Sequence, residues 1–259
     1  MTRSIFTQTL KEQRRGLIGW SIALFAVPMM YVPSYESFAE QGALDMEGGG
    51  IYDAMGMGDF NTAAGYLDST MFSLMGPLLL LIFAITFGAR TASQEESGTL
   101  DLILAQPVSR TKVLAQRFAA LTVQTAIVTG VFGAAILAGA SAGNMDLPAG
   151  NILAAVVGTG LLALAFGAIT QMVGALTGHR ASAIGISAII AVAGYFANNL
   201  GGMDPDTEWL RYLSPFYYAT GDSPLTNGWN LGLIAVLVIL PMATLALSLS
   251  TFNRRDLAV

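Results

Sequence analysis

Six long apolar stretches constrain this chain more than any other feature of its sequence. They cover approximately residues 16–35, 70–91, 118–141, 151–177, 182–201 and 231–252, and Arg90 is the only acid or base within them. A helix needs about 20 apolar residues to cross roughly 30 Å of hydrocarbon. Soluble domains carry about a quarter charged residues, but here 11% are charged and mean hydropathy is +0.60. The sequence therefore predicts an all-α integral membrane protein with six transmembrane helices.

Basic residues indicate how this protein is oriented in the membrane. If both termini are cytoplasmic, the inner segments hold all of the chain's 12 basic residues except Arg211. An excess of Lys and Arg in short loops marks the cytoplasmic side, and the opposite orientation would leave Arg211 alone inside. We therefore expect cytoplasmic N and C termini and a multi-pass location in the cell (inner) membrane.

Residues 1–16 are predicted to form an amphipathic helix that lies in the inner interface, ahead of the six-span domain at residues 17–259. The two faces of this helix carry Ile5, Phe6, Thr9 and Leu10 on one side and Lys11, Arg14 and Arg15 on the other. An apolar face opposite a basic one is typical of interfacial helices. A soluble tail is the alternative.

The segment between the second and third stretches, residues 95–110, has a pattern of its own. Gly98 weakens the helix that leaves the second stretch, and Thr99 can cap a new helix with Asp101 in its first turn. Pro107 ends that helix because the residue before a proline is pushed out of the α region. Ser109 can then cap the helix of the third stretch. The pattern predicts a short cytoplasmic helix of about two turns or less.

This short helix carries an apolar stripe. Leu100, Ile103 and Leu104 fall at i, i+3 and i+4, so they share one face. The segment is too short and too polar to enter lipid, and an exposed apolar ridge favours a partner surface. The residues alone leave two interpretations open: a helix that docks on a partner, and an ordinary interfacial helix that packs on its own protein.

The segment resembles the coupling segment of a known family, the membrane (permease) subunits of type-2 ATP-binding-cassette (ABC) exporters. The resemblance rests on Glu95, Glu96, Gly98, Thr99, Leu100, Asp101, Leu104, Pro107, Val108, Ser109 and Arg110. Six spans, an N-terminal interfacial helix, and residues 9–20, 213–218 and 252–257 are also similar to that family. The resemblance therefore extends over most of the chain.

The resemblance implies an exporter permease that is driven by a separate nucleotide-binding subunit. The coupling helix would dock on that ATPase subunit, which would bind ATP and Mg, through Glu95, Glu96, Gly98, Thr99, Leu100, Asp101, Ile103, Leu104, Pro107, Val108, Ser109 and Arg110. The family further implies a dimer with a second copy or a homologue. Its transport path would lie between the second and fifth spans.

Two further groups of residues are candidates for that path. Asn198 and Asn199 are polar residues near the outer end of the fifth span, where they could face the route. In the family, the loop that follows forms short re-entrant helices that close the outer end. By this resemblance, Leu213, Pro215, Phe216 and Tyr217 would form an outer gate, although an aromatic belt at headgroup level is the alternative.

The sequence lacks the residues that several classes of function require. A phosphate-binding loop ends in Gly-Lys-Ser/Thr, whereas the only lysines, Lys11 and Lys112, do not follow glycine. The chain has no cysteine and one histidine, His179, so we expect no metal site. No base accompanies the serines and threonines of the spans, which disfavours an enzyme. We also expect no cofactor in this chain and no nucleic-acid partner.

Two other functions remain open from the sequence. A membrane assembly or recruitment protein could use the same short helix without any transport of its own. An ion-coupled carrier is disfavoured because such carriers keep acids or bases at membrane depth, where these spans have none. No residue selects a transport substrate.

Small residues recur along two of the predicted spans. Gly160, Gly167 and Gly174 repeat every seven residues on the fourth span, and Ala183, Ser187 and Ala191 recur every four on the fifth. Small side chains allow membrane helices to approach closely. We expect both stripes to pack within one subunit, in preference to forming a dimer seam or a substrate track.

Overall fold

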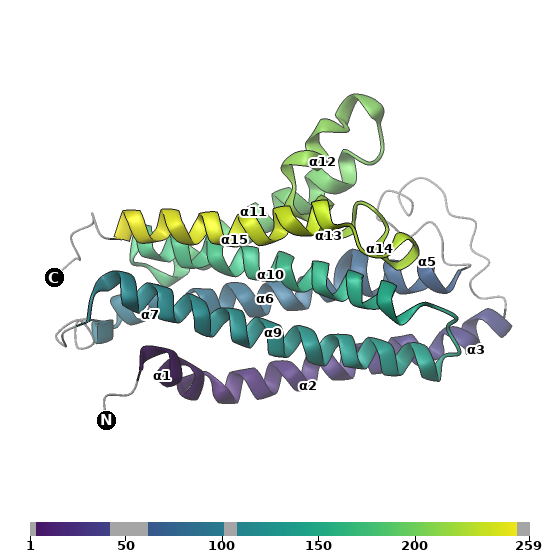
Figure 1. Cartoon of the computed structure of the whole chain (residues 1–259), viewed down its shortest axis with the longest axis horizontal. Helices are drawn as coiled ribbons and strands as arrows, with labels where there is room; N and C mark the ends of the chain where they lie inside the picture. Colours follow the sequence, from purple (N-terminus) through teal and green to yellow (C-terminus); the bar gives the residue numbers. More distant parts are fainter. Residues whose placement is uncertain (1–3, 42–61, 101–107, 253–259) are drawn as a thin grey trace.

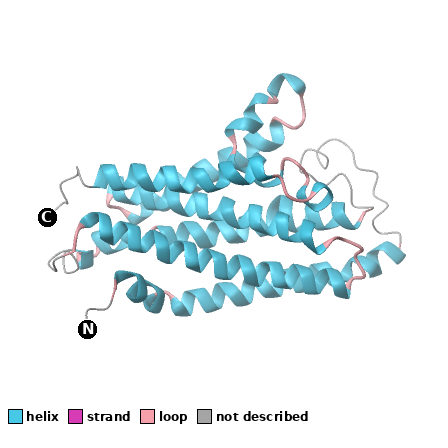
Figure 2. Cartoon of the chain, viewed as in Figure 1, coloured by secondary structure: helices cyan, strands magenta, loops and turns pink. Residues whose placement is uncertain are grey.

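A computed structural model describes residues 4–41, 62–100 and 108–252 of the chain, and all regular structure in these ranges is helical (Figures 1 and 2). Six helical segments are long and apolar enough to cross a membrane: Arg14–Glu40, Ala63–Glu96, Arg110–Ala142, Ala149–Thr177, Arg180–Leu200 and Leu231–Thr251. The six predicted stretches coincide with them, and the all-α, six-span prediction is confirmed. The orientation of the termini stays a prediction.

Several of these helices are longer than the apolar stretches, so charged residues lie inside them. Asp68 falls within the second helical segment, and Arg117 within the third. Both residues lie just outside the apolar stretches, within which Arg90 is the only acid or base. Each extension adds polar turns beyond the apolar stretch, because helical hydrogen bonds continue outside the hydrocarbon.

The first two spans are each built from several helices. Span 1 comprises α2 (Arg14–Tyr31), η1 (Val32–Ser34) and α3 (Tyr35–Glu40), preceded by α1 (Ile5–Glu12). Span 2 comprises α5 (Ala63–Leu67), a π-helical stretch η2 (Asp68–Met75), α6 (Gly76–Gly88) and α7 (Arg90–Glu96). Wide π turns of this kind are frequent at functional sites. The other spans are α9 (Arg110–Ala142), α10 (Ala149–Thr177), α11 (Arg180–Leu200) and α15 (Leu231–Phe252).

Helix α10 lies at the centre of the bundle, where it packs against α6, α9, α11 and α15 (Figure 1). Its Phe166 is fully buried and contacts Phe216, with 5.8 Å between ring centroids. By contrast, α2, α11 and α15 each leave an apolar face exposed, for example at Ile22 (64% exposed), Ile189 (69%) and Ile239 (63%). Such faces suit lipid or another membrane protein.

The glycine stripe of α10 packs within the subunit, as the sequence indicates. A Cβ at Gly160 would lie 2.5 Å from Thr129 of α9, and one at Gly174 would lie 3.1 Å from Ala92 of α7. The closest approach is between α6 and α10, where a Cβ on Gly88 would lie 2.4 Å from the carbonyl oxygen of Gly167. These glycines therefore set the distance between α10 and its neighbours.

The small stripe of α11 also faces inward. Ala183 and Ser187 are fully buried, and Ala191 is 8% exposed. The larger apolar residues of α11 point away from the bundle. The expectation of packing within one subunit is confirmed for both stripes.

Four short helices follow α11. They are η3 (Pro205–Thr207), α12 (Trp209–Leu213), α13 (Pro215–Thr220) and α14 (Pro224–Asn227). Figure 1 shows α12 projecting away from the bundle, whereas α13 lies beside the helices. This arrangement places α14, the last of the four short helices, at the end of the bundle opposite α1.

We predict that Gly88→Ala destabilises the protein by about 1–3 kcal/mol, since the new methyl group would overlap the backbone of α10. Gly185→Ala in α11 is the matched control, because its Cβ would meet nothing within 4 Å. Both changes raise helix propensity by about 1 kcal/mol. Thermal unfolding of the purified protein should show a lower midpoint for Gly88→Ala and an unchanged or higher one for Gly185→Ala. Equal midpoints would contradict the close packing of α6 on α10.

Candidate functional site

The end of the bundle where α1 begins and α15 ends gathers the candidate coupling segment (Figure 1). We call it the basic end, because Arg14, Arg90, Arg110 and Arg180 lie there at helix termini. Helix α7 ends at this end and α9, α11 and α2 start there. Most of the predicted coupling residues therefore sit where four spans meet.

The helix of span 2 ends where the sequence predicts. Helix α7 stops at Glu96, and Gly98 adopts a φ of 69°, a left-handed conformation that glycine takes without strain. Helical conformation resumes at Thr99, so Thr99 lies in the new helix and does not precede it as a cap. Its hydroxyl bonds to the hydroxyl of Ser97 and to the Gln94 carbonyl, the latter at 3.3 Å. Asp101, Ile103, Leu104 and Pro107 lie outside the described residues.

Leu100 does not belong to an exposed ridge. It is fully buried in a small cluster with Val113, Leu114 and Ala175, and Ile5 packs against the same cluster. These residues come from α9, α10 and α1, so Leu100 anchors the segment to its own subunit. At Leu100 the structure therefore agrees with the interpretation in which the short helix packs on its own protein, and the docking of residues 95–110 on a partner stays a prediction.

The other end of the segment is also anchored. Val108 packs against the Leu100 cluster, and the Ser109 hydroxyl accepts a hydrogen bond from the Lys112 backbone N–H at 3.3 Å. Ser109 therefore caps α9, which begins at Arg110, as predicted. Both ends of residues 95–110 are thus fixed to α9.

Glu96 has an internal role that the sequence did not indicate. Its carboxylate accepts the backbone N–H of Arg180, the first residue of α11, at 3.2 Å. An acid at a helix N-terminus satisfies a free donor and interacts favourably with the helix dipole. Glu96 therefore links the end of span 2 directly to the start of span 5.

A network of polar side chains ties α1 to spans 2 and 3. Glu12 forms an ion pair with Arg90 at 2.5 Å and accepts a hydrogen bond from Gln94 at 3.5 Å. Gln94 in turn accepts from Arg117, which is only 5% exposed. A buried guanidinium requires such partners. No local pattern marks this network, because Glu12 and Arg90 are far apart in the sequence.

The surroundings of Glu12 lower the pKa of its carboxyl group. Burial alone would raise the pKa of Glu12, but hydrogen bonds from Gln8 and Arg90 and the charges of Arg90 and Arg117 lower it overall from 4.5. Glu12 is consequently ionised at neutral pH. The ion pair is about one-third exposed, which limits its contribution to stability.

Glutamine side chains join other helices near this end. Gln116 accepts the Phe6 backbone N–H at 3.1 Å, and Gln124 donates to Gln13 at 3.2 Å. Gln171 of α10 donates to the Leu114 carbonyl of α9 at 2.9 Å. Gln124 of span 3 and Gln171 of span 4 therefore form hydrogen bonds to other segments of the chain.

The candidate path residues, Asn198 and Asn199, lie at the C-terminal end of α11 and are half-buried. The Asn198 side-chain oxygen is buried without a hydrogen-bond partner among the described residues. A cavity of about 180 Å³ lies between span 2 and α11, lined by Leu74, Pro77, Tyr195 and Phe216 among others. Asn198 and Asn199 are not among the residues that line it. The structure therefore does not bring them to the groove between spans 2 and 5.

The candidate gate residues divide between two environments. Ser214 caps α13 by accepting the Phe216 N–H at 3.2 Å, and it donates to the Gly194 carbonyl of α11 at 2.7 Å. Phe216 is buried and lines the cavity, whereas Leu213 is 72% exposed. Tyr217 lies under the Arg211 guanidinium, 5.1 Å from the ring centroid.

Pro215 is the first residue of α13, where its fixed φ suits a helix start. It follows the Ser214 cap and precedes the buried Phe216. Of the four candidate gate residues, Phe216 is therefore the one that contacts both α10 and the cavity.

These features define a multi-pass helical membrane protein whose spans are tied together at one polar end. A comparison with family models then identifies the family: the chain belongs to the ABC-2 family transporter proteins, whose model matches residues 4–257. A comparison with curated proteins finds no match. The chain is a membrane permease of ABC-type transport, and membership of this family implies an ATPase partner.

We predict that Glu12→Gln loosens α1, because the neutral amide loses the ion pair with Arg90. Exposed ion pairs contribute about 0.3–1 kcal/mol, so hydrogen-exchange protection of α1 should fall about two- to fivefold at pH 7.

The pH dependence of hydrogen-exchange protection in α1 provides the control for Glu12→Gln. The pKa of Glu12 is lowered in the folded protein, so its stabilisation is present above pH 4.5 and is lost as the pH falls below that value. Wild-type protection should decrease on acidification toward that of Glu12→Gln, which should change less. Equal protection of the two proteins at pH 7 would contradict the role of Glu12.

Proposed function

We propose that this permease is the membrane subunit of an ATP-driven exporter in the inner membrane, with both termini in the cytoplasm. The match of residues 4–257 to the ABC-2 family carries the proposal. The basic end would face the cytoplasm, as expected for a Lys- and Arg-rich side. Residues 95–110 would dock on a separate subunit that hydrolyses ATP, while this chain supplies the path.

The anchoring of the docking segment supports this coupling role. Leu100 packs on α9 and α10, and Leu249 of α15 packs against the same cluster. Glu96 holds the start of α11. A displacement of the segment would therefore act on spans 3 to 6 together, because packed elements move as units.

The glycine between these two anchors supports motion of the segment. Gly98 lies between Glu96 and Leu100 with a positive φ, and a Cβ there would meet nothing within 4 Å. Few steric contacts restrain it. Hinges are commonly such residues at the ends of elements. We infer that α7 and the segment anchored by Leu100 change their relative angle at Gly98 when the ATPase subunit moves.

The cavity between span 2 and α11 supports a path at a dimer interface. It is lined mainly by apolar side chains, for example Leu78, Leu81 and Val192. On its own, this open face would contact lipid, whereas a second copy of the permease would enclose it. An apolar path of this kind suits an amphipathic or hydrophobic cargo.

The position of Phe216 supports an outer gate at the cavity between span 2 and α11. Its ring lies 5.7 Å from that of Tyr195 and 5.8 Å from that of Phe166. It therefore joins α13 to the cavity and to α10. A movement of the spans would change how Phe216 covers the outer end of the cavity.

We predict that Leu104→Asp abolishes substrate-stimulated ATP hydrolysis by the reconstituted permease and ATPase complex. The charge would disrupt an apolar docking contact, while the permease still inserts into the membrane.

Leu100→Asp is the informative comparison, because Leu100 is buried inside the permease. Burying an unpaired carboxylate costs several kcal/mol, so this variant should lower the thermal midpoint as well as the stimulation. If Leu104→Asp retained full stimulation, the docking role of the segment would be refuted.

A further inference from the structure

A groove of about 430 Å³ lies along the seam between α2 and α9, which run side by side in Figure 1. We call it the α2/α9 groove. The residues that line it are Leu17, Ile18, Ser21, Ile22, Phe25 and Ala26 of α2, with Ile127 of α9. The hollow exists because Ser21 and Ala26 are smaller than the residues around them. No residue of this groove lines the proposed path cavity.

The α2/α9 groove covers one half of the membrane. From Leu17 to Ala26 it extends about 14 Å along α2, which is close to half of the roughly 30 Å of hydrocarbon in a bilayer. Arg14, the first residue of α2, lies about 4.5 Å beyond Leu17 on the side of the basic end. The groove therefore runs from near headgroup level to the middle of the bilayer. An acyl chain of one leaflet occupies the same depth.

Basic side chains lie at the mouth of the groove. Arg14 precedes Leu17 and Ile18 by three and four residues, so it shares the groove's face of α2. Arg15 precedes Ile18 by three residues, and Lys11 lies one turn earlier in the last turn of α1. All three bases are exposed. They lie at the depth where the headgroup of a lipid in the groove would be.

The structure leaves the charge of these bases uncompensated. Glu12 is the only acid in residues 4–31, and its carboxylate forms the ion pair with Arg90. None of Lys11, Arg14 and Arg15 forms an ion pair with a described residue. The mouth of the groove therefore carries an excess of positive charge, which a negatively charged headgroup would complement.

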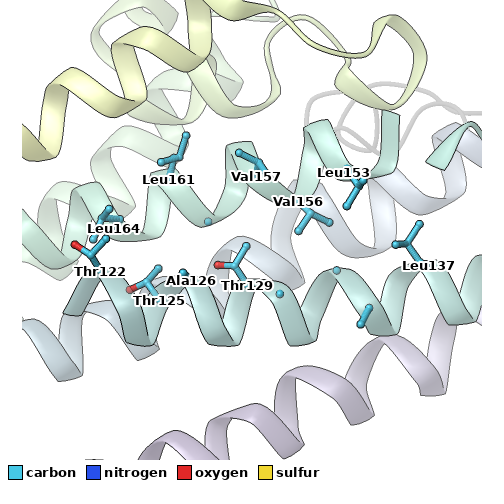
Figure 3. A pocket seen from close by; sticks show the side chains of 14 residues that line it. Thr122, Thr125, Ala126, Thr129, Leu137, Leu153, Val156, Val157, Leu161 and Leu164 are labelled. Carbon is cyan, nitrogen blue, oxygen red and sulfur yellow. The ribbon is translucent and has the colours of Figure 1, made fainter. Parts of the chain in front are cut away.

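This charge distinguishes the α2/α9 groove from the larger hollow between α9 and α10. That hollow has a volume of about 470 Å³, but no charged residue lines it (Figure 3). Its walls would accept any lipid chain or helix. The α2/α9 groove, by contrast, joins an apolar hollow to bases at one end.

The same charge favours a lipid over a second copy of the chain. A two-fold symmetric contact through α2 would bring the same surface of both copies together. Arg14 and Arg15 of one copy would then lie at the depth of the same two residues of the other, and like charges repel. A soluble anion would match the bases but leave the apolar walls exposed.

We propose that the α2/α9 groove binds an anionic phospholipid from the leaflet at the basic end. One acyl chain lies along Ile18, Ile22 and Phe25, and the phosphate lies beside Arg14 and Arg15. A guanidinium suits this position, because it can donate two parallel hydrogen bonds to a phosphate.

This site goes beyond the proposed transport function and can be tested on the permease without an ATPase. The full chain is placed in vesicles of synthetic phosphatidylcholine that contain a trace of one photoactivatable lipid. The two probes are phosphatidylglycerol and phosphatidylcholine, with the same acyl chains and the same photoreactive group on the chain. Each nearby base favours an anionic lipid by about fivefold, so the phosphatidylglycerol probe should label residues 17–26 about five- to twenty-five-fold more strongly.

A charge variant makes the result specific to the bases. A double Arg14→Gln and Arg15→Gln variant should label equally with both probes, because it removes the charge and keeps the apolar groove. Arg180→Gln, at the start of α11, is the matched control. It removes a base at the same end of the bundle, but α11 and α2 lie on opposite sides of α10 in Figure 1. This control should keep the wild-type preference.

A second pair of variants tests the groove itself. Ala26→Phe fills the end of the groove away from the bases, and the fold tolerates the larger side chain because Ala26 is exposed. Ala193→Phe is the matched control, at an exposed position of α11. The preference for phosphatidylglycerol at residues 17–26 should be lost in Ala26→Phe and kept in Ala193→Phe.

Three outcomes would overturn the proposal. Equal labelling of the wild-type protein by both probes would mean that the groove holds lipid chains without recognising an anionic headgroup. Loss of the preference when inorganic phosphate replaces chloride at constant ionic strength would mean that the bases bind a soluble anion. Faster disulfide formation between copies carrying Ile22→Cys than between copies carrying Ile239→Cys, on the exposed face of α15, would place a second copy in the groove. Both variants are clean because the natural chain has no cysteine.

Discussion

The close approach of α6 and α10 is the contact on which the rest of the bundle depends. Gly88 meets the carbonyl of Gly167, and the absence of a side chain there brings the two backbones together. Lipid tails are as apolar as the side chains, so membrane helices associate mainly through such packing. With α6 seated on α10, the helices α9, α11 and α15 gather around the same central helix.

At the basic end, the bundle is held by polar contacts instead. Glu96 caps α11, the pair of Glu12 and Arg90 holds α1, and Leu100 fixes the coupling segment on α9 and α10. The described ends of this candidate segment, residues 95–100 and 108–110, are therefore part of the subunit's own packing. A partner that moved the segment would act on the spans through these packing contacts and hydrogen bonds.

Periodicity and composition were sufficient to predict the spans, the small-residue stripes and the Ser109 cap. Ser109 caps α9 and Gly98 ends α7 because these are local effects of a residue and its immediate neighbours. The burial of Leu100 could not be predicted in this way, because it depends on Val113 and Ala175, which the chain brings back from later helices. The network of Glu12 depends on tertiary contacts in the same way. Sequence patterns indicate which face is apolar, but not which neighbour covers it.

The proposed coupling requires the basic end of the bundle to meet an ATPase subunit. This contact can be tested with a photo-crosslinking amino acid placed at position 104 in living cells, with position 213 at the opposite end as the comparison. Position 104 should capture a subunit whose sequence contains a Gly-Lys-Ser/Thr loop, and position 213 should not. Capture of such a subunit at position 213, or at neither position, would contradict it.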